Sequence, residues 1–366
     1  MKNKIFLILA VVFVSLTSCT NQDAEFENFD YKSVYFAYQS PVRTITLGDD
    51  VFDTSADNAY RCKIMATLGG VYSNDSEVTI NFEVANSLTT GLKFKDGGDI
   101  VAMPSNYYSL SSDKIVISKG QITGGVDVQL TDAFFADPLA IGKSYVIPLL
   151  MKSVTNADTI LSGKALVANP NKAIAQDWSV APKDYILYAV KFVNRWHANY
   201  LRRGTDVVTK DNGLATIEKR KKEYVEYDEV VKLSTLSLSK LVFPISNYKT
   251  KFGINLNLKV DLTLDANEKI NVKEREASYQ LNDSTTVYNI AASGTGSFVK
   301  KGEKKSWGNQ DRDGMYLDYN VNYTIRTTFP KKGLPADIQE VKYVTKDTLV
   351  LRDRGVTAEV FEALRK

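Results

Sequence analysis

One stretch decides the fold class: INLNLKVDLTLD, residues 254–265. Its apolar residues alternate strictly with Asn, Lys, Asp and Thr. Because successive side chains of a β-strand point to opposite faces, this alternation is typical of a strand with one buried face and one hydrated face. Such strands belong to antiparallel sheets packed on one side, whereas the strands of parallel sheets have continuous apolar runs. The stretch therefore predicts antiparallel β structure.

The same alternation recurs in both halves of the chain. It is found in residues 78–84 (VTINFEV) and 317–325 (LDYNVNYTI). Gly, Asn and Asp cluster between such runs, as expected of turns that connect strands. No long amphipathic helix is evident, and short helices are expected only near Phe134, around 171–176 and at 358–365. The predicted fold class is all-β.

Two domains are predicted from the chain length and from one break in the pattern. A chain of 366 residues is expected to form two or three domains of ordinary size. The sequence ANPNK at 168–172 ends an apolar run and opens a polar stretch, so residues 169–183 are interpreted as a linker. Strand spacing in residues 31–168 favours an immunoglobulin-like β-sandwich. The longer strands of residues 184–366 suit either an antiparallel sandwich or a barrel.

The first residues have the layout of an export signal. An apolar run from Ile5 to Val14 follows a short basic start. The run is too short to span a bilayer, which takes about 20 apolar residues. Leu16-Thr17-Ser18-Cys19 then resembles a bacterial lipobox. We therefore expect residues 1–18 to be removed, Cys19 to be acylated and residues 19–30 to form a tether, which implies a lipid-anchored protein at the surface of the outer membrane. An ordinary secretory signal is the alternative.

The charge balance argues against one class of partner. Lys and Arg number 46 and Asp and Glu 43, and two of the basic residues, Lys2 and Lys4, lie in the expected signal. A nucleic-acid-binding protein needs a concentrated basic surface to neutralise phosphates. The basic runs at 219–222 and 300–305 are interpreted as solvated hairpin edges, where charge discourages edge-to-edge pairing of strands. No nucleic-acid partner is therefore expected.

The sequence holds little of the equipment of common catalysts. His197 is the single histidine, and with Cys19 acylated only Cys62, expected to be a buried thiol, remains. A Ser or Cys nucleophile usually needs a histidine base, and zinc needs clustered His and Cys ligands. Residues 309–314 match only half of a calcium loop and are interpreted as a hairpin turn. No catalytic residue, metal or cofactor is expected, although a pair of carboxylates for glycoside hydrolysis is left open.

Short motifs in both halves carry a family resemblance. They are YSL (108–110), IVISKG (115–120), GVDV (125–128), YVIPL (145–149), YAVKFVNRWH (188–197), YLRRG (200–204), WGN (307–309) and LRDRGV (351–356). The motifs of the first half resemble an N-terminal domain of unknown function that many surface lipoproteins of gut anaerobes share, and that also precedes family-18 glycoside hydrolase modules. The motifs of the second half are similar to its usual C-terminal β-rich partner domain.

The resemblance implies a function in glycan uptake. Such proteins work with the porin and lid proteins of starch-utilisation-type systems, so the resemblance implies non-catalytic capture of host or dietary oligosaccharides at the cell surface. Where an enzymatic relative has a hydrolase barrel, this chain has the second β domain. A surface adhesin or a structural component of the uptake complex is the first alternative. A glycoside hydrolase is the second.

Binding a sugar needs an aromatic face for the apolar side of the pyranose ring and polar groups for its hydroxyls. Trp307 precedes polar residues in a loop, and a ring folded over the hairpin is the alternative. Tyr200, Arg202 and Arg203 are interpreted as a polar rim, and a solvated arginine pair at a strand end is the alternative. Trp178 lies in the expected linker, where a wedge between the domains is the alternative. The candidate glycan-binding residues are Trp307, Asn309, Gln310, Tyr200, Arg202 and Trp178.

Overall fold

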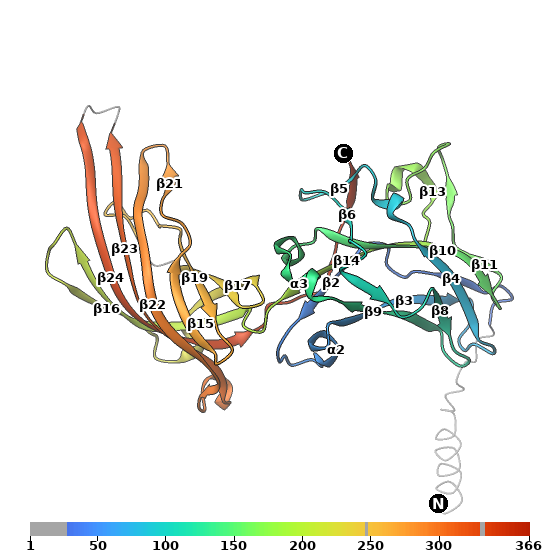
Figure 1. Ribbon diagram of the computed structural model, residues 1–366, viewed down its shortest axis with the longest axis horizontal. Coiled ribbons are helices and arrows are strands. Elements are labelled where there is room, and N and C mark those ends of the chain that lie inside the picture. Colours follow the sequence, from blue (N-terminus) through green and yellow to red (C-terminus); the bar gives the residue numbers. More distant parts are fainter. Residues whose placement is uncertain (1–27, 246–247, 330–333) are drawn as a thin grey trace, which may run out of the picture.

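The computed structural model describes residues 28–245, 248–329 and 334–366. Two β-rich units lie side by side along the long axis of the molecule (Figure 1). The N-terminal unit is a sandwich of two sheets, and the C-terminal unit is one large sheet rolled on itself. The predicted all-β class is confirmed. The expected signal, residues 1–18, and the expected lipidation site Cys19 lie outside the described residues.

The sandwich consists of a five-stranded and a seven-stranded sheet. The first has the order β11-β1-β3-β9-β7, with β1 (Ser33–Tyr35), β3 (Arg61–Gly69), β7 (Tyr108–Leu110), β9 (Thr123–Leu130) and β11 (Thr159–Ile160). The second has the order β25-β2-β14-β10-β4-β8, with β6 beside β10: β2 (Pro41–Thr46), β4 (Val78–Val84), β6 (Val101–Ala102), β8 (Lys114–Ile117), β10 (Tyr145–Thr155), β14 (Tyr185–Val193) and β25 (Glu359–Val360).

Short elements complete the N-terminal unit. Two small ladders pair β5 (Leu92–Phe94) with β26 (Ala363–Arg365) and β12 (Lys164–Ala165) with β13 (Trp178–Val180). The helical pieces are α2 (Ser55–Asn58), η1 (Asn86–Thr89), α3 (Asp132–Ala136), η2 (Pro138–Ile141) and η3 (Ala175–Asp177). A short helix is therefore present near Phe134, as predicted, whereas residues 358–365, expected to be helical, contain two short strands.

The core of the sandwich lies between its two sheets. Side chains that alternate along the strands fill it from both sides, among them Ile64, Val128 and Phe192, which are fully buried. A second apolar cluster, which includes Leu187 and Phe361, covers the other face of the seven-stranded sheet. Strands β10 and β14 are thus buried on both faces, and this explains their continuous apolar runs.

The boundary between the units differs from the prediction, which placed a linker at 169–183 and started the second domain at 184. In the structure β14 is a central strand of the sandwich, antiparallel to β10 and parallel to β2. The chain also returns to the sandwich after the barrel, because β25 pairs with β2 and β26 with β5. The sandwich therefore extends to Val193 and includes the C-terminal tail, and its sheets are not purely antiparallel.

The C-terminal unit is a closed barrel. Its ring has the order β15-β17-β18-β19-β20-β22-β23-β24, and β24 pairs with β15 to close it. Of the two predicted architectures, sandwich or barrel, the structure has the barrel. The strands are β15 (Ala198–Lys210), β17 (Glu229–Ser237), β18 (Lys240–Ile245), β19 (Leu258–Leu264), β20 (Lys269–Glu274), β22 (Thr285–Glu303), β23 (Arg312–Phe329) and β24 (Leu334–Asp353), with β16 (Thr216–Arg220), β21 (Tyr279–Asn282), η4 (Val225–Tyr227) and η5 (Trp307–Asn309) attached.

The alternation in residues 254–265 predicts the barrel face correctly. Leu258 and Leu262 point into the apolar core of the barrel, whereas Lys259 and Asp261 between them are partly exposed. Only the second part of the stretch is a strand, and Ile254 at its start is 40% exposed.

An ionic network crosses the apolar interior of the barrel. Arg202 donates through Nε to Asp347 Oδ2 at 3.0 Å, and the Tyr319 hydroxyl donates to the same oxygen at 2.8 Å. Arg220 donates to Asp347 Oδ1 at 2.7 Å and to Asp206 Oδ2 at 2.5 Å. The interpretation of the basic run 219–222 as a solvated edge is therefore wrong for Arg220. Its guanidinium is bound in the barrel wall by the carboxylates of Asp206 and Asp347.

Within the described residues, no helix has the length and apolar character needed to cross a membrane.

Candidate functional site

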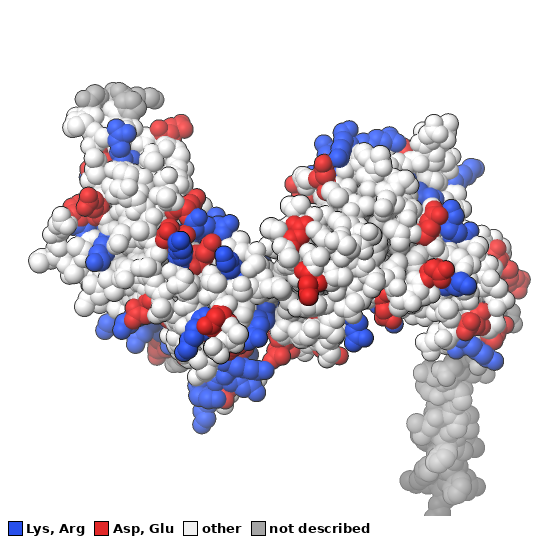
Figure 2. Space-filling model, in the orientation of Figure 1, with Lys and Arg blue, Asp and Glu red and all other residues white. Residues whose placement is uncertain are grey.

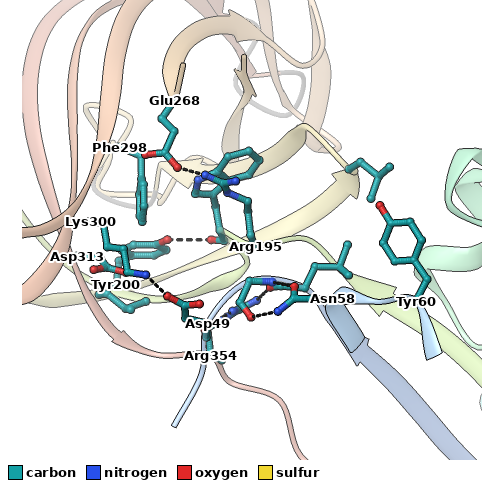
Figure 3. Close-up of a pocket in the computed structure, with 15 residues that line it drawn as sticks. Asp49, Asn58, Tyr60, Arg195, Tyr200, Glu268, Phe298, Lys300, Asp313 and Arg354 are labelled. Atoms are coloured by element: carbon teal, nitrogen blue, oxygen red, sulfur yellow. Dashed lines mark hydrogen bonds and ion pairs between the residues drawn. The ribbon is translucent and has the colours of Figure 1, made fainter. Parts of the chain in front are cut away.

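A pocket of about 500 Å³ lies at the junction of the two units (Figure 3). The sandwich contributes the turn after β2 and residues around α2. The barrel contributes the turn before β15, residues of strands β15, β22, β23 and β24, and the β19–β20 connection. The polar and aromatic residues that line it are Asp49, Asn58, Tyr60, Arg195, Trp196, Tyr200, Glu268, Phe298, Lys300, Asp313 and Arg354.

Arg354 joins the two units at this pocket. Its guanidinium donates to the carbonyl oxygens of Leu47 at 3.0 Å and Asp49 at 2.8 Å in the sandwich. It also donates to the carbonyl oxygens of Asn194 at 2.9 Å and His197 at 2.8 Å, where the chain enters the barrel. The side chain is buried, and burial lowers its pKa. Because a charged fork binds backbone acceptors from both segments, their relative position is fixed.

Gly48 allows the two units to approach closely beside the pocket. Its φ of +86° is a conformation that residues with a side chain rarely adopt. A Cβ atom at this position would lie 2.6 Å from the Cβ atom of Arg195. The turn after β2 therefore needs glycine for its backbone conformation and for the space that it leaves to the barrel.

Two ion pairs flank the pocket, and both appear as dashed lines in Figure 3. Lys300 pairs with Asp49 across the junction, and Arg195 pairs with Glu268. The hydrogen bond from Lys300 lowers the pKa of Asp49, so this carboxylate is ionised. Because these groups are partly exposed, we expect little stability from the pairs. They place alternating charges around the opening.

The lysine-rich hairpin that carries Lys300 lies at one tip of the barrel. Figure 2 shows a group of basic side chains at the lower end of the barrel, where the β22–β23 hairpin lies in Figure 1. Lys304 pairs with Asp311 within this hairpin, and the lysines of the run 300–305 are exposed. This run is a solvated hairpin edge, as predicted.

The aromatic part of the pocket centres on Trp196. The guanidinium of Arg195 lies 4.7 Å from the centroid of the Trp196 ring. The Tyr200 hydroxyl donates a hydrogen bond to the carbonyl oxygen of Trp196 at 2.9 Å. The indole Nε1 is buried and has no hydrogen-bond partner among the described residues. Phe298 and Tyr60 add partly exposed rings to the wall. A buried donor without an acceptor carries an energetic cost, and this N–H belongs to a residue that lines the pocket.

Two titratable groups at or beside the pocket have lowered pKa values. The acid of a glycoside hydrolase has a raised pKa, whereas the pKa of Asp49 is lowered. His197 is buried beside the pocket, and its Nδ1 accepts a hydrogen bond from the Thr235 backbone N–H at 3.1 Å. Burial lowers the pKa of His197 to about 4, so the ring is neutral and structural. No cluster of three or more His, Cys, Asp or Glu side chains suited to a metal occurs within residues 28–245, 248–329 and 334–366.

The first candidate from the sequence, Trp307, lies close to the pocket but does not line it. Its Nε1 donates to the carbonyl oxygen of Leu351 at 3.0 Å, and the guanidinium of Arg312 lies 3.5 Å from its ring centroid. One face of the ring and its polar atom are therefore engaged, as the folded-over alternative predicts. Asn309 and Gln310 are exposed beside it, and their role in binding stays a prediction.

The other candidates are separated from one another. Tyr200 lines the pocket, but Tyr200 and Arg202 are each 1% exposed inside the barrel, so the expectation of a polar rim is wrong for both. Their register on β15 points them inward. Trp178 lies on the sandwich, where its Nε1 donates to the carbonyl oxygen of Asn171 at 2.8 Å and its ring lies 5.4 Å from the Lys172 ammonium.

Sequence reasoning missed most of the pocket. Asp49 and Asn58 come from the sandwich, Glu268 from the β19–β20 connection of the barrel and Phe298 from strand β22. The turn Asp265-Ala266-Asn267 before Glu268 is visible in the sequence, but nothing in the sequence says that it faces the sandwich.

Comparisons with known proteins give two family models and several solved structures. A model described as a domain of unknown function, DUF5627, matches residues 195–355, and a model described as an N-terminal domain matches residues 28–158. A solved protein of unknown function from Bacteroides ovatus is 42% identical, with a TM-score of 0.80, over 92% of this chain and 100% of that chain. An auxiliary nutrient binding protein from Bacteroides thetaiotaomicron VPI-5482 is 14% identical over 84% of this chain and 90% of that chain, and its TM-score of 0.35 is too low to support an argument. No curated protein matches the chain.

Proposed function

This chain belongs to the family of the Bacteroides ovatus protein, and from the pocket between its two units we propose that it is a glycan-binding protein that holds an oligosaccharide without cleaving it. Ligand pockets of a few hundred Å³ commonly occur where two domains meet. A volume of about 500 Å³ suits a short saccharide. The wall combines rings, amides and charged groups, which is the combination that a pyranose ring with several hydroxyls needs.

The buried indole N–H of Trp196 carries the proposal. This N–H has no partner among the described residues and belongs to a residue that lines the pocket, so we expect a sugar hydroxyl or ring oxygen to accept its hydrogen bond. Glu268, which pairs with Arg195, adds a carboxylate that can accept from a sugar hydroxyl, and Phe298 supplies an apolar surface for the C–H face of the sugar. The contacts of Arg354 hold both walls in place before a ligand arrives, which reduces the entropy lost on binding.

The location and the partners extend the proposal. We propose that the export signal is removed, that Cys19 is acylated, and that the protein is anchored at the surface of the outer membrane. There it would deliver oligosaccharides to a porin and lid of an uptake complex. Mass spectrometry of the protein from native membranes tests the anchor: an acylated Cys19 at the new N-terminus supports it, and an unmodified peptide containing residues 1–18 contradicts it.

A glycan screen tests the binding function. Residues 20–366, the chain without its signal and lipidated cysteine, are applied to an array of host and plant oligosaccharides, and hits are measured by calorimetry. In Trp196→Phe, which keeps a ring but lacks the N–H, we expect about three- to tenfold weaker binding, the value of one neutral hydrogen bond. Trp178→Phe removes an indole N–H outside the pocket and should bind like the parent.

Three outcomes contradict the proposal, each in a different way. Release of reducing ends from a bound glycan would show a glycoside hydrolase. A protein that ignores every sugar but co-purifies with a porin complex would be an adhesin or a structural component. Glycan binding that Trp196→Phe leaves unchanged would keep the function but move the site away from the interdomain pocket.

A further inference from the structure

A second pocket lies in the wall of the barrel, where one edge of β15 is shared by two strands. The first residues of β15, Ala198 to Arg202, pair with β17, and the next, Gly204 to Val208, pair with β16. The sheet therefore divides between β16 and β17. A pocket of about 340 Å³ lies at this division, away from the interdomain pocket.

Positive charge dominates this second pocket. Its acidic residues are Asp228 and Glu229, and Asp228 already accepts hydrogen bonds from Arg203 Nε at 2.6 Å and from the Lys222 backbone N–H at 2.7 Å. Arg203 does not line the pocket, so a cation outside it compensates Asp228, and Asp347 and Asp206, also outside it, compensate Arg202 and Arg220. The lysines of the pocket are what leaves it positive. The basic residues that line the pocket are Arg202, Lys219, Arg220, Lys221 and Lys222.

Two buried guanidinium nitrogens in this wall lack a hydrogen bond, and one of them has only a longer ion pair with Glu229. Arg202 Nη1 and Arg220 Nη1 are buried without a hydrogen-bond partner among the described residues. Arg202 is 1% exposed, and its Nη1 lies 3.7 Å from the Glu229 carboxylate, which lines the same pocket. The Nε and Nη2 atoms of both arginines are held by the carboxylates of the barrel interior. The guanidinium groups are thus fixed in orientation, and both belong to residues that line the basic pocket.

Two exposed tyrosines stand next to the pocket in the chain. Tyr224 is 55% exposed and Tyr227 is 69% exposed, and their rings form an edge-to-face pair with centroids 6.1 Å apart. They lie on the segment that connects Lys222 to Asp228, both of which line the pocket. Large exposed rings of this kind are available to a ligand, because no core packing accounts for them.

We propose that this pocket binds the carboxylate or sulfate group of an acidic sugar, with the sugar ring against the Tyr224–Tyr227 pair. The sugar part rests on the proposed glycan-binding function, whereas the anion part rests only on the charges and donors of the pocket. The site is distinct from the interdomain pocket and assigns a substrate class, acidic glycans, to the protein.

Pairs of ligands that differ only in charge test the site by calorimetry on residues 20–366. The probes are a galacturonic acid trisaccharide, its neutral methyl ester, and a sulfated galactose oligosaccharide with its desulfated form. We expect the charged member of at least one pair to bind about tenfold more tightly than its neutral partner, with an affinity that falls as salt is added. The pair that shows this difference identifies the anion as carboxylate or sulfate.

Variants assign the binding to the pocket. The double variant Lys219→Gln/Lys222→Gln changes two exposed side chains and should abolish most of the preference for the charged member. The control Lys114→Gln/Lys119→Gln removes two exposed lysines of the sandwich and should keep the preference. Tyr227→Ala should weaken the binding of both members of a pair. An equal charge preference in both double variants, or none in the parent, overturns the site.

Sodium sulfate separates this inference from the glycan-binding function. The midpoint of thermal unfolding is compared in sulfate and chloride at equal ionic strength, because sulfate also stabilises proteins in general. We expect a larger sulfate shift in the parent and in Trp196→Phe than in the Lys219/Lys222 double variant. A sulfate shift without any glycan binding would retain the anion pocket and refute the glycan-binding function. The same shift in all chains refutes the anion pocket.

Discussion

Arg354 Nη2 donates a hydrogen bond to the carbonyl oxygen of Leu47 at 3.0 Å, and this contact connects the end of the barrel to the sandwich. The same guanidinium reaches three further carbonyl oxygens around the junction. The interdomain pocket therefore depends on a residue that belongs to the chain segment between the barrel and the C-terminal tail. Beyond Arg354, the tail strands β25 and β26 pair with β2 and β5 of the sandwich.

Replacement of Arg354 by lysine should loosen the junction. Lysine keeps the charge but cannot serve four carbonyl oxygens that are spread around a planar fork. We expect the free energy of unfolding to fall by about 2–4 kcal/mol, because buried acceptors lose charged donors. Urea unfolding followed by tryptophan fluorescence measures it. Arg352→Lys, a change at a half-exposed neighbour, should have almost no effect, and equal curves for both variants would contradict the role of Arg354.

Gly48→Ala should destabilise the protein by more than the cost of placing alanine at a positive φ. Alanine at a positive φ costs roughly 1–2 kcal/mol by itself. At Gly48 its Cβ would also meet Arg195, whereas at Gly91, with φ +70°, no atom lies within 4 Å of the added Cβ. We therefore expect Gly48→Ala to be clearly less stable than Gly91→Ala and to bind glycan more weakly. Equal thermal unfolding midpoints for the two variants would show that the approach of the units is not tight.

Parts of this architecture follow from the sequence, because the alternation of apolar and polar residues indicates which face of a strand is exposed to solvent. Leu258 to Leu264 show this directly. Strand β14 does not, since it is buried on both faces and its partners β2 and β10 are distant in sequence. The apolar run of β14 therefore indicates a buried strand, but it does not show whether the strand belongs to the sandwich or to the barrel.

The candidate site was harder to predict than the fold. Tyr200 and Arg202 lie two residues apart on one face of β15, and Ala198 and Val208 on the same face are apolar and buried. The alternation along β15 indicates that Tyr200 and Arg202 point into the barrel. Their polar side chains, however, suggested a position on a surface rim. The carboxylate that makes a buried Arg202 tolerable, Asp347, is far along the chain, and no local pattern reveals the pair.

Asp347→Asn should destabilise the barrel strongly. The Asp347 carboxylate accepts from Arg202, Arg220 and Tyr319, so the neutral amide leaves two buried guanidinium groups with reduced compensation. We expect a loss of about 3–5 kcal/mol in the free energy of unfolding. Asp318→Asn, at an exposed ion pair with Lys346 on the outer face of the barrel, should cost less than about 1 kcal/mol. Chemical denaturation measures the free energy of unfolding of both variants. A small decrease for Asp347→Asn would mean that water reaches the ionic network.

His197 should make the protein less stable in mild acid. Burial lowers its pKa from the ordinary 6.5 to about 4, so below pH 6.5 the unfolded chain takes up a proton that the folded chain refuses. The contribution is complete above pH 6.5 and is lost progressively as the pH falls towards 4, by up to about 3 kcal/mol. His197→Asn keeps an acceptor for the Thr235 N–H but cannot titrate. Because carboxylates titrate alike in both chains, the difference between their urea unfolding free energies at pH 7 and pH 4.5 isolates the imidazole, and parallel pH profiles would show that His197 is solvated.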